Sequence, residues 1–191
     1  MNLPTLAVVS GGPGTGKTTL AHALAHELGC PAIIRDEIKQ GMVMSTPGYR
    51  SGGDDPLNRP TLDAFFDALR VLLRARVTVV AEAAFQDRLW RPNLEPLAHI
   101  ARIRIVHCTV PAAVAHDRII QRVTENTHRA AHGDHDLLEA IAAGEHSLES
   151  FVPVSLDVPT QAVDTSHGYT PGIRDITAFV RGTAADEAGP G

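Results

Sequence analysis

One short segment constrains the fold of this chain more than any other. Residues 11–18 read Gly-Gly-Pro-Gly-Thr-Gly-Lys-Thr and fit the pattern G-x-x-x-x-G-K-[ST]. The segment directly follows an apolar run, Leu6–Ser10, and precedes a helical pattern that stops at Gly29. A strand, a glycine-rich loop and a helix in this order predict a P-loop, the phosphate-binding loop of an α/β domain.

Each residue type in the P-loop has a physical reason. Glycines let the backbone turn its N–H groups towards phosphates, and the following helix adds its positive N-terminal end. Lys17 is expected to contact the β- and γ-phosphates, Thr18 to coordinate Mg²⁺ through its hydroxyl, and Thr19 to touch the α-phosphate. ATP and Mg²⁺ are therefore the expected cofactors. The predicted nucleotide-binding residues are Gly11, Gly12, Pro13, Gly14, Thr15, Gly16, Lys17, Thr18 and Thr19.

The remainder of the chain predicts an α/β fold of the P-loop NTPase type. Apolar runs alternate with helical patterns, which indicates a five-stranded parallel sheet with helices on both faces and a small helical lid. We expect one domain over residues 1–181, with the lid at about 118–145 and a disordered tail at 182–191. The expected strands are 6–10, 32–34, 77–81, 103–107 and 162–165. The expected helices are 16–29, two turns after 34, 61–76, 87–98, 111–123, 135–143 and 171–181, and 45–60 is expected to be a loop.

Composition and net charge restrict the binding partners and the location that we expect for this protein. The net charge of −5 disfavours a polyanionic partner such as nucleic acid. No stretch approaches the ~20 apolar residues of a membrane span, and residues 3–9 are predicted to be a core strand rather than a signal peptide. A cytoplasmic protein is expected, with Cys30 and Cys108 as reduced thiols. The oligomeric state cannot be predicted.

An acid follows the second predicted strand. Asp36 could cap the next helix, but the carboxyl ends of parallel strands line the ligand crevice, so it is also a candidate general base facing the P-loop. If Asp36 is the cap, Lys39 lies in the first turn of the helix, where the helix dipole disfavours a cation. We expect Lys39 to pair with the substrate, or with Asp36 or Glu37.

Three further residues are candidates for the site. Glu82 ends the apolar run 77–81 and could serve the Mg²⁺ shell or orient the acceptor. Arg118 and Arg122 lie four residues apart and would share one edge of a helix. They are either a solvated basic edge or lid residues that stabilise the γ-phosphate in the transition state.

These motifs carry a family resemblance. The P-loop followed by Arg35-Asp36-Glu37-x-Lys39-Gln40 resembles the 5′-kinase domain of polynucleotide kinases, and the small P-loop phosphotransferases that include chloramphenicol phosphotransferase and the zeta-type toxins. The resemblance implies that Asp36 is the general base and that Lys39 contacts the acceptor. The Arg118-x-x-x-Arg122 spacing resembles the lid of these kinases.

The resemblance also has departures and weaker extensions. The family more often has Asp where this chain has Glu82, and the polynucleotide kinases follow it with Thr where this chain has Ala83. The run 162–166 resembles the last strand of these kinases, which would bring His167 and Tyr169 near the base. Candidates without a firm role are Arg129 in the lid and the histidines His128, His132 and His135. The aromatic residues Tyr49, Phe65, Phe85 and Trp90 could line the acceptor pocket, and core packing explains Phe65 equally well.

The leading hypothesis is an ATP-dependent phosphotransferase that moves the γ-phosphate to a hydroxyl of a small molecule. Asp36, Lys17, Arg118 and Arg122 are its predicted catalytic residues, and Arg35, Lys39 and Glu82 its predicted substrate-binding residues. Two alternatives remain: a nucleic-acid 5′-hydroxyl kinase, and a regulatory ATPase that transfers phosphate only to water. The acceptor, and the preference for ATP or GTP, cannot be read from the sequence.

Overall fold

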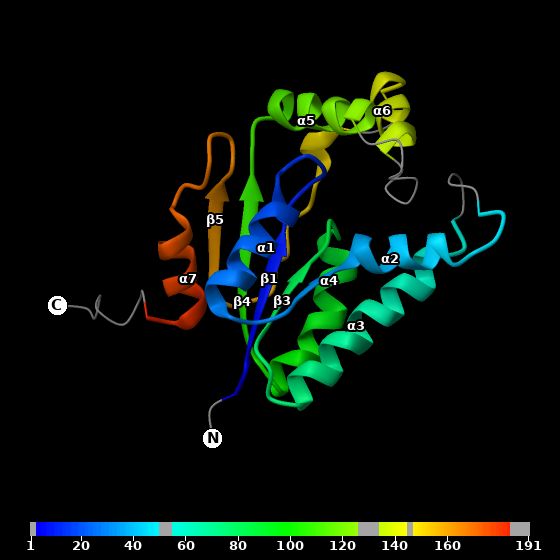
Figure 1. The fold of residues 1–191 in the computed structure, drawn as a ribbon. Coiled ribbons are helices and arrows are strands. Elements are labelled where there is room, and N and C mark those ends of the chain that lie inside the picture. Colours follow the sequence, from blue (N-terminus) through cyan, green and yellow to red (C-terminus); the bar gives the residue numbers. More distant parts are fainter. Residues whose placement is uncertain (1–2, 50–54, 126–133, 145–146, 184–191) are drawn as a thin grey trace.

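The computed structural model describes residues 3–49, 55–125, 134–144 and 147–183. Five parallel strands form one sheet in the order β2-β3-β1-β4-β5, so the predicted sheet is confirmed (Figure 1). The strands are β1 (Thr5–Ser10), β2 (Ala32–Ile34), β3 (Val79–Glu82), β4 (Arg102–Thr109) and β5 (Thr160–Asp164). The strand β1 lies in the middle, hydrogen-bonded to β3 and β4.

Helices connect the strands. They are α1 (Lys17–Leu28), α2 (Arg35–Met44), α3 (Asn58–Arg74), α4 (Asp87–Leu94), α5 (Ala112–Glu125), α6 (Asp134–Ala142) and α7 (Ile173–Arg181), with short 3₁₀ helices η1 (Glu95–His99) and η2 (Leu148–Ser150). The helix α1 ends where predicted, because Gly29 takes the left-handed conformation and its N–H caps the carbonyls of Ala25 and His26. The sequence patterns did not predict η2.

Alternating side chains of the strands fill two cores, one on each face of the sheet. Leu6 and Val8 of β1 point into a core shared with α3 and α4, whereas Ala7 and Val9 point into a core shared with α1 and α7. All four residues are fully buried, which explains why the strand reads as a continuous apolar run. The prediction of helices on both faces is therefore confirmed.

The aromatic residues of α3 and α4 belong mainly to the first core. Phe65 and Trp90 are fully buried, with ring centroids 5.8 Å apart, and so they do not line a pocket. Phe85 joins the same cluster, with its ring centroid 5.2 Å from that of Trp90. Of the four aromatic candidates, only Phe85 is both part of this core and part of a cavity wall, as described below.

Two helix boundaries change the sequence interpretation. The helix α2 begins at Arg35 with Ile34 as its N-cap, so Asp36 lies inside the first turn and is not the cap. The helix α3 begins at Asn58, three residues earlier than expected, and its start supplies polar groups to the site. The helices α5 and α6 contact each other beyond the carboxyl end of β4, where the lid is expected (Figure 1).

Candidate functional site

The P-loop takes the conformation that its glycines predict. Gly11, Gly14 and Gly16 have φ values of 149°, 77° and 72°, in the region that residues with side chains avoid. Space is also limiting, because a Cβ at Gly14 would lie 2.4 Å from the carbonyl oxygen of Ala115 in α5. The loop leads directly into the N-terminus of α1, where backbone N–H groups favour an anion.

The two polar residues at the start of α1 meet the end of β3. The Thr18 hydroxyl donates a hydrogen bond of 2.9 Å to Oε2 of Glu82, and Nζ of Lys17 lies 3.9 Å from Oε1 of the same carboxylate. Lys17 is 7% exposed and Glu82 only 2%. The parallel pairing of β1 with β3 places Val9 beside Glu82, which brings that carboxylate to the P-loop.

Burial dominates the chemistry of Glu82. Desolvation raises the pKa of its carboxyl, and the charge of Asp36 acts in the same direction, whereas Lys17 and the Thr18 hydroxyl lower it. A hydroxyl and a carboxylate at the N-terminus of a phosphate-binding helix are oxygen ligands of the kind that Mg²⁺ takes. Thr18 and Glu82 therefore fit a Mg²⁺ site, which supports a metal role for Glu82 over acceptor binding.

A cavity of about 400 Å³ opens between the P-loop, α5 and the loop after β5. Lys17, Thr18 and Thr19 line it from the P-loop side, and Arg118 and Arg122 from α5. Thr165, Gly168 and Tyr169 complete the opposite wall, whereas His167 is not among the lining residues. The cavity thus joins phosphate-binding groups to the segment predicted to border the base.

Arg118 is held within the protein. Its guanidinium donates to the carbonyl oxygen of Thr165 at 2.7 Å, to that of Ser166 at 3.2 Å, and to that of Gly14 at 3.4 Å. It also donates to the Thr165 hydroxyl at 3.3 Å. Arg118 therefore ties α5 and the loop after β5 to the P-loop. Arg122, one turn further along α5, lines the same cavity.

A second cavity, of about 490 Å³, lies beside Asp36. We call it the acceptor cavity because it adjoins Asp36, the predicted general base. It is lined by Arg35, Asp36, Asn58, Arg59, Leu62, Ala84, Phe85 and Leu89. The Asp36 carboxylate accepts a hydrogen bond of 2.9 Å from Nη1 of Arg35, and its charge acts on the pKa of Glu82. Asp36 therefore lines the acceptor cavity and lies close enough to Glu82 for its charge to act there.

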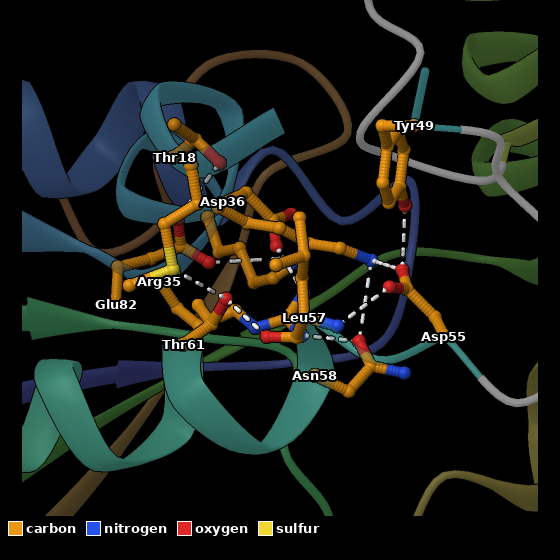
Figure 2. Close-up of polar contacts among 12 residues, drawn as sticks. Thr18, Arg35, Asp36, Tyr49, Asp55, Leu57, Asn58, Thr61 and Glu82 are labelled. Carbon is orange, nitrogen blue, oxygen red and sulfur yellow. Dashed lines mark hydrogen bonds and ion pairs between the residues drawn. The ribbon is translucent and has the colours of Figure 1, made fainter. Parts of the chain in front are cut away.

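Lys39 pairs with a residue that the sequence patterns did not suggest. Its ammonium lies 2.5 Å from Oδ2 of Asp55 and donates to Oδ1 of Asn58 at 3.2 Å (Figure 2). The Tyr49 hydroxyl also donates to Asp55, at 2.7 Å. Lys39 and Asp55 have side chains only 9% and 8% exposed, so this is a buried ion pair.

Asn58 links this ion pair to the acceptor cavity, because its Oδ1 also accepts a hydrogen bond of 2.8 Å from Nη2 of Arg35. Pairing of Lys39 with Asp36 or Glu37 was the expectation if it did not face the substrate. The available signal for Asp55 was its place in the 45–60 loop, close to the start of the next helix, but a contact across a loop has no sequence period to reveal it.

Several predicted candidates lie outside the described residues. Arg129, His128 and His132 fall there, and for His135 only the backbone is described. Among the side chains that are described, no group of three or more His, Cys, Asp or Glu could hold a metal ion. Within that same part of the chain, no helix has the length and apolarity needed to cross a bilayer.

The fold and the P-loop together define a P-loop NTPase domain. The chain belongs to the AAA domain family (AAA_33), whose model matches residues 6–145. It is also similar to the protein Rv2004c of Mycobacterium tuberculosis H37Rv and to Mb2027c of Mycobacterium bovis, each 30% identical over 149 residues. The match covers 72% of this chain but only 29% of each of those longer proteins.

Solved structures share the fold. A candidate kinase from Chloroflexus aurantiacus J-10-fl superposes with a TM-score of 0.78 at 23% identity, over 95% of this chain and 99% of the other. A sugar kinase from Janibacter sp. HTCC2649 has a TM-score of 0.62 at 20% identity, over 95% and 97%. A chain of the Pnkp1/Rnl/Hen1 RNA repair complex has 0.56 at 17%, over 78% and 48%.

Proposed function

We propose that this protein is an ATP-dependent phosphotransferase that moves the γ-phosphate to a hydroxyl group of a small molecule. The observation that carries the proposal is that polar groups which influence one another line two separate cavities. Thr18 lines the nucleotide cavity and contacts Glu82, the charge of Asp36 acts on Glu82, and Asp36 lines the acceptor cavity. A nucleotide in the first cavity and an alcohol in the second would meet near these groups. The kinases among the structural neighbours support the same reading.

Phosphoryl transfer needs positioning and charge neutralisation more than covalent chemistry by the protein. In the proposed reaction the acceptor oxygen forms a bond to the γ-phosphorus while the bond to the β–γ bridging oxygen breaks, and ADP leaves. The hydroxyl proton goes to the carboxylate of Asp36. Lys17 and the N–H groups of the P-loop hold the phosphates.

The remaining roles follow from the contacts. Thr18 and Glu82 would hold Mg²⁺, which neutralises charge on the β- and γ-phosphate oxygens when bound. Arg122 would reach the γ-phosphate from α5, as part of a lid formed by α5 and α6. Arg118 would maintain the shape of the nucleotide cavity rather than act on the γ-phosphate. Its guanidinium already donates hydrogen bonds to the carbonyl oxygens of Thr165, Ser166 and Gly14. Lys39 would fix the start of α3 through Asp55 and Asn58.

A transfer assay with ATP labelled in the γ-phosphate tests the proposal. The protein is incubated with labelled ATP, Mg²⁺ and a panel of small alcohols, a 5′-hydroxyl oligonucleotide, or buffer alone. Label on a small alcohol, lost in Lys17→Ala, is the expected result. Label on the oligonucleotide would instead favour a nucleic-acid kinase, which the likeness to a chain of the RNA repair complex makes the second candidate. Free phosphate that no acceptor stimulates would favour a regulatory ATPase.

A further inference from the structure

The acceptor cavity is lined by two chemically distinct groups of residues. Arg35, Asp36 and Asn58 form a polar group, and these three side chains are already hydrogen-bonded to one another through Arg35, so they lie together and are called the polar end. Leu62, Ala84, Phe85 and Leu89 form the rest of the described wall, and their side chains offer no hydrogen bond to a ligand. The fourth polar residue is Arg59, whose Nε lies 3.0 Å from Oδ2 of Asp63. Its side chain is 80% exposed, so it belongs to the rim of the cavity.

From this division we infer that the acceptor is an alcohol with an aromatic or branched aliphatic body, rather than a sugar or other polyol. The inference rests on the proposed phosphotransferase function and names its substrate class. The hydroxyl would lie at the Asp36 end and the apolar body against Leu62, Ala84, Phe85 and Leu89. A volume of about 490 Å³ suits a small molecule.

Desolvation decides between the two substrate classes. Each hydroxyl of a polyol that enters the apolar part would lose its water partners without replacement, at a cost of about 1–3 kcal/mol. An apolar body in the same place gains about 25 cal/mol for each Å² removed from water. The desolvation cost of several unpaired hydroxyls would therefore exceed the free energy gained from hydrogen bonds at the polar end.

The apolar wall is firmly supported. Phe85 packs against Phe65, Phe66 and Trp90, with ring centroids 5.8, 6.1 and 5.2 Å away. Ala84 is exposed to the cavity, and its small side chain leaves room there. Because Ala84 lies in the loop after β3 and outside the core, a larger residue at this position should alter the cavity while leaving the fold intact.

The chain carries its own reporter for binding. Trp90 is its single tryptophan, is fully buried, and packs directly on Phe85. A ligand that contacts Phe85 should change the environment of this indole. Tryptophan fluorescence can therefore follow occupancy of the acceptor cavity, with a non-hydrolysable ATP analogue and Mg²⁺ present to fill the nucleotide cavity.

The test compares 3-phenyl-1-propanol with glucose, by fluorescence titration and by the labelled-phosphate assay. We expect saturable binding of the aryl alcohol at least tenfold tighter than that of glucose, with the same order of kcat/KM. Ala84→Glu should weaken binding of the aryl alcohol at least tenfold by placing a carboxylate in the apolar wall. Ala98→Glu, which changes an exposed alanine in η1, is the matched control and should leave binding unchanged. Thermal melts of both variants establish that they fold.

The outcomes separate this inference from the function on which it rests. Asp36-dependent transfer to glucose in preference to the aryl alcohol would overturn the substrate class and leave the phosphotransferase standing. Tight binding of the aryl alcohol, sensitive to Ala84→Glu but without transfer to any alcohol, would keep the ligand class and overturn the reaction. An absence of saturable binding by the aryl alcohol, or indifference to Ala84→Glu, would overturn the inference itself.

Discussion

At the scale of single residues, the buried carboxyl of Glu82 makes a prediction about pH. Burial raises its pKa, so between the ordinary value of 4.5 and the raised value the folded protein holds a proton that the unfolded chain has lost. The stability contributed by the neutral carboxyl is complete below pH 4.5 and is lost as the pH rises through the folded pKa.

Glu82→Gln keeps the shape of the neutral carboxyl at every pH. Without nucleotide or metal, we expect this variant to melt at a higher temperature than the parent protein at pH 7.5, with the difference vanishing below pH 4.5. Glu95→Gln, at a surface pair with a carboxylate side chain 51% exposed, should change little and is the control. A lower melting temperature for Glu82→Gln at pH 7.5 would contradict the account.

The ion pair of Lys39 and Asp55 predicts strong energetic coupling. Lys39→Met alone leaves the Asp55 carboxylate buried without its cation, at a cost of about 3–5 kcal/mol of unfolding free energy. Lys39→Met combined with Asp55→Leu removes both charges and should recover most of that loss. Urea unfolding of the two single variants and the double variant measures the coupling, and simple additivity would contradict a direct pair.

The same pair gives the opposite pH dependence to Glu82. Burial alone would raise the pKa of Asp55, but hydrogen bonds from Lys39, Tyr49 and the Leu57 N–H outweigh it and lower the pKa. This stability is therefore present above the ordinary value of 3.8 and is lost as the pH falls through the folded pKa. Unfolding measured down the acid side should show this loss in the parent protein and not in the double variant.

At the scale of elements, Arg118 joins three segments that carry the nucleotide cavity. Its guanidinium holds the loop after β5 and the P-loop to α5, and the Thr165 hydroxyl adds a hydrogen bond of 2.6 Å to the carbonyl oxygen of Thr15. Arg118 therefore determines the shape of the nucleotide cavity, whereas Arg122 lines that cavity and is the proposed contact of the γ-phosphate.

Arg118→Met should weaken ATP binding about 10–100-fold, since hydrogen bonds to a charged group contribute about 1.5–3 kcal/mol. Its kcat at saturating ATP should fall much less. Arg122→Met should show the reverse, with a large fall in kcat and a small change in ATP affinity. Calorimetric titration of ATP together with steady-state kinetics separates the two, and a pure kcat effect for Arg118→Met would contradict its positioning role.

At the scale of the whole molecule, the sequence predicted the parts of the site that follow from local pattern. Apolar periodicity and the glycines determine the P-loop, the parallel sheet, the place of Asp36 just after β2 and the place of Glu82 at the end of β3. The Thr18–Glu82 contact could be anticipated only in general, because the two residues are 64 positions apart and meet only through the pairing of β1 with β3.

The sequence patterns did not predict contacts between segments that share no helical or strand periodicity. Asp55 pairs with Lys39, and Asn58 pairs with Arg35, because the chain returns to α2 at the start of α3. The helix α3 begins earlier than expected, so these contacts were not predicted. The role of Arg118 at the γ-phosphate stays a prediction, and the long-range hydrogen bonds that link it to the loop after β5 were not part of that prediction. The acceptor cavity combines residues from α2, α3, α4 and the loop after β3, so its apolar character could not be read from any one segment.

The arrangement of two cavities around Asp36 makes one residue central to the proposed reaction. In Asp36→Asn, transfer of labelled γ-phosphate to an accepted small alcohol should fall at least ~100-fold, because a positioned general base contributes about 10²–10⁴. ATP affinity, measured by calorimetry in the same variant, should remain nearly unchanged, since Asp36 lines the acceptor cavity and not the nucleotide cavity. Unchanged transfer in Asp36→Asn would contradict the account.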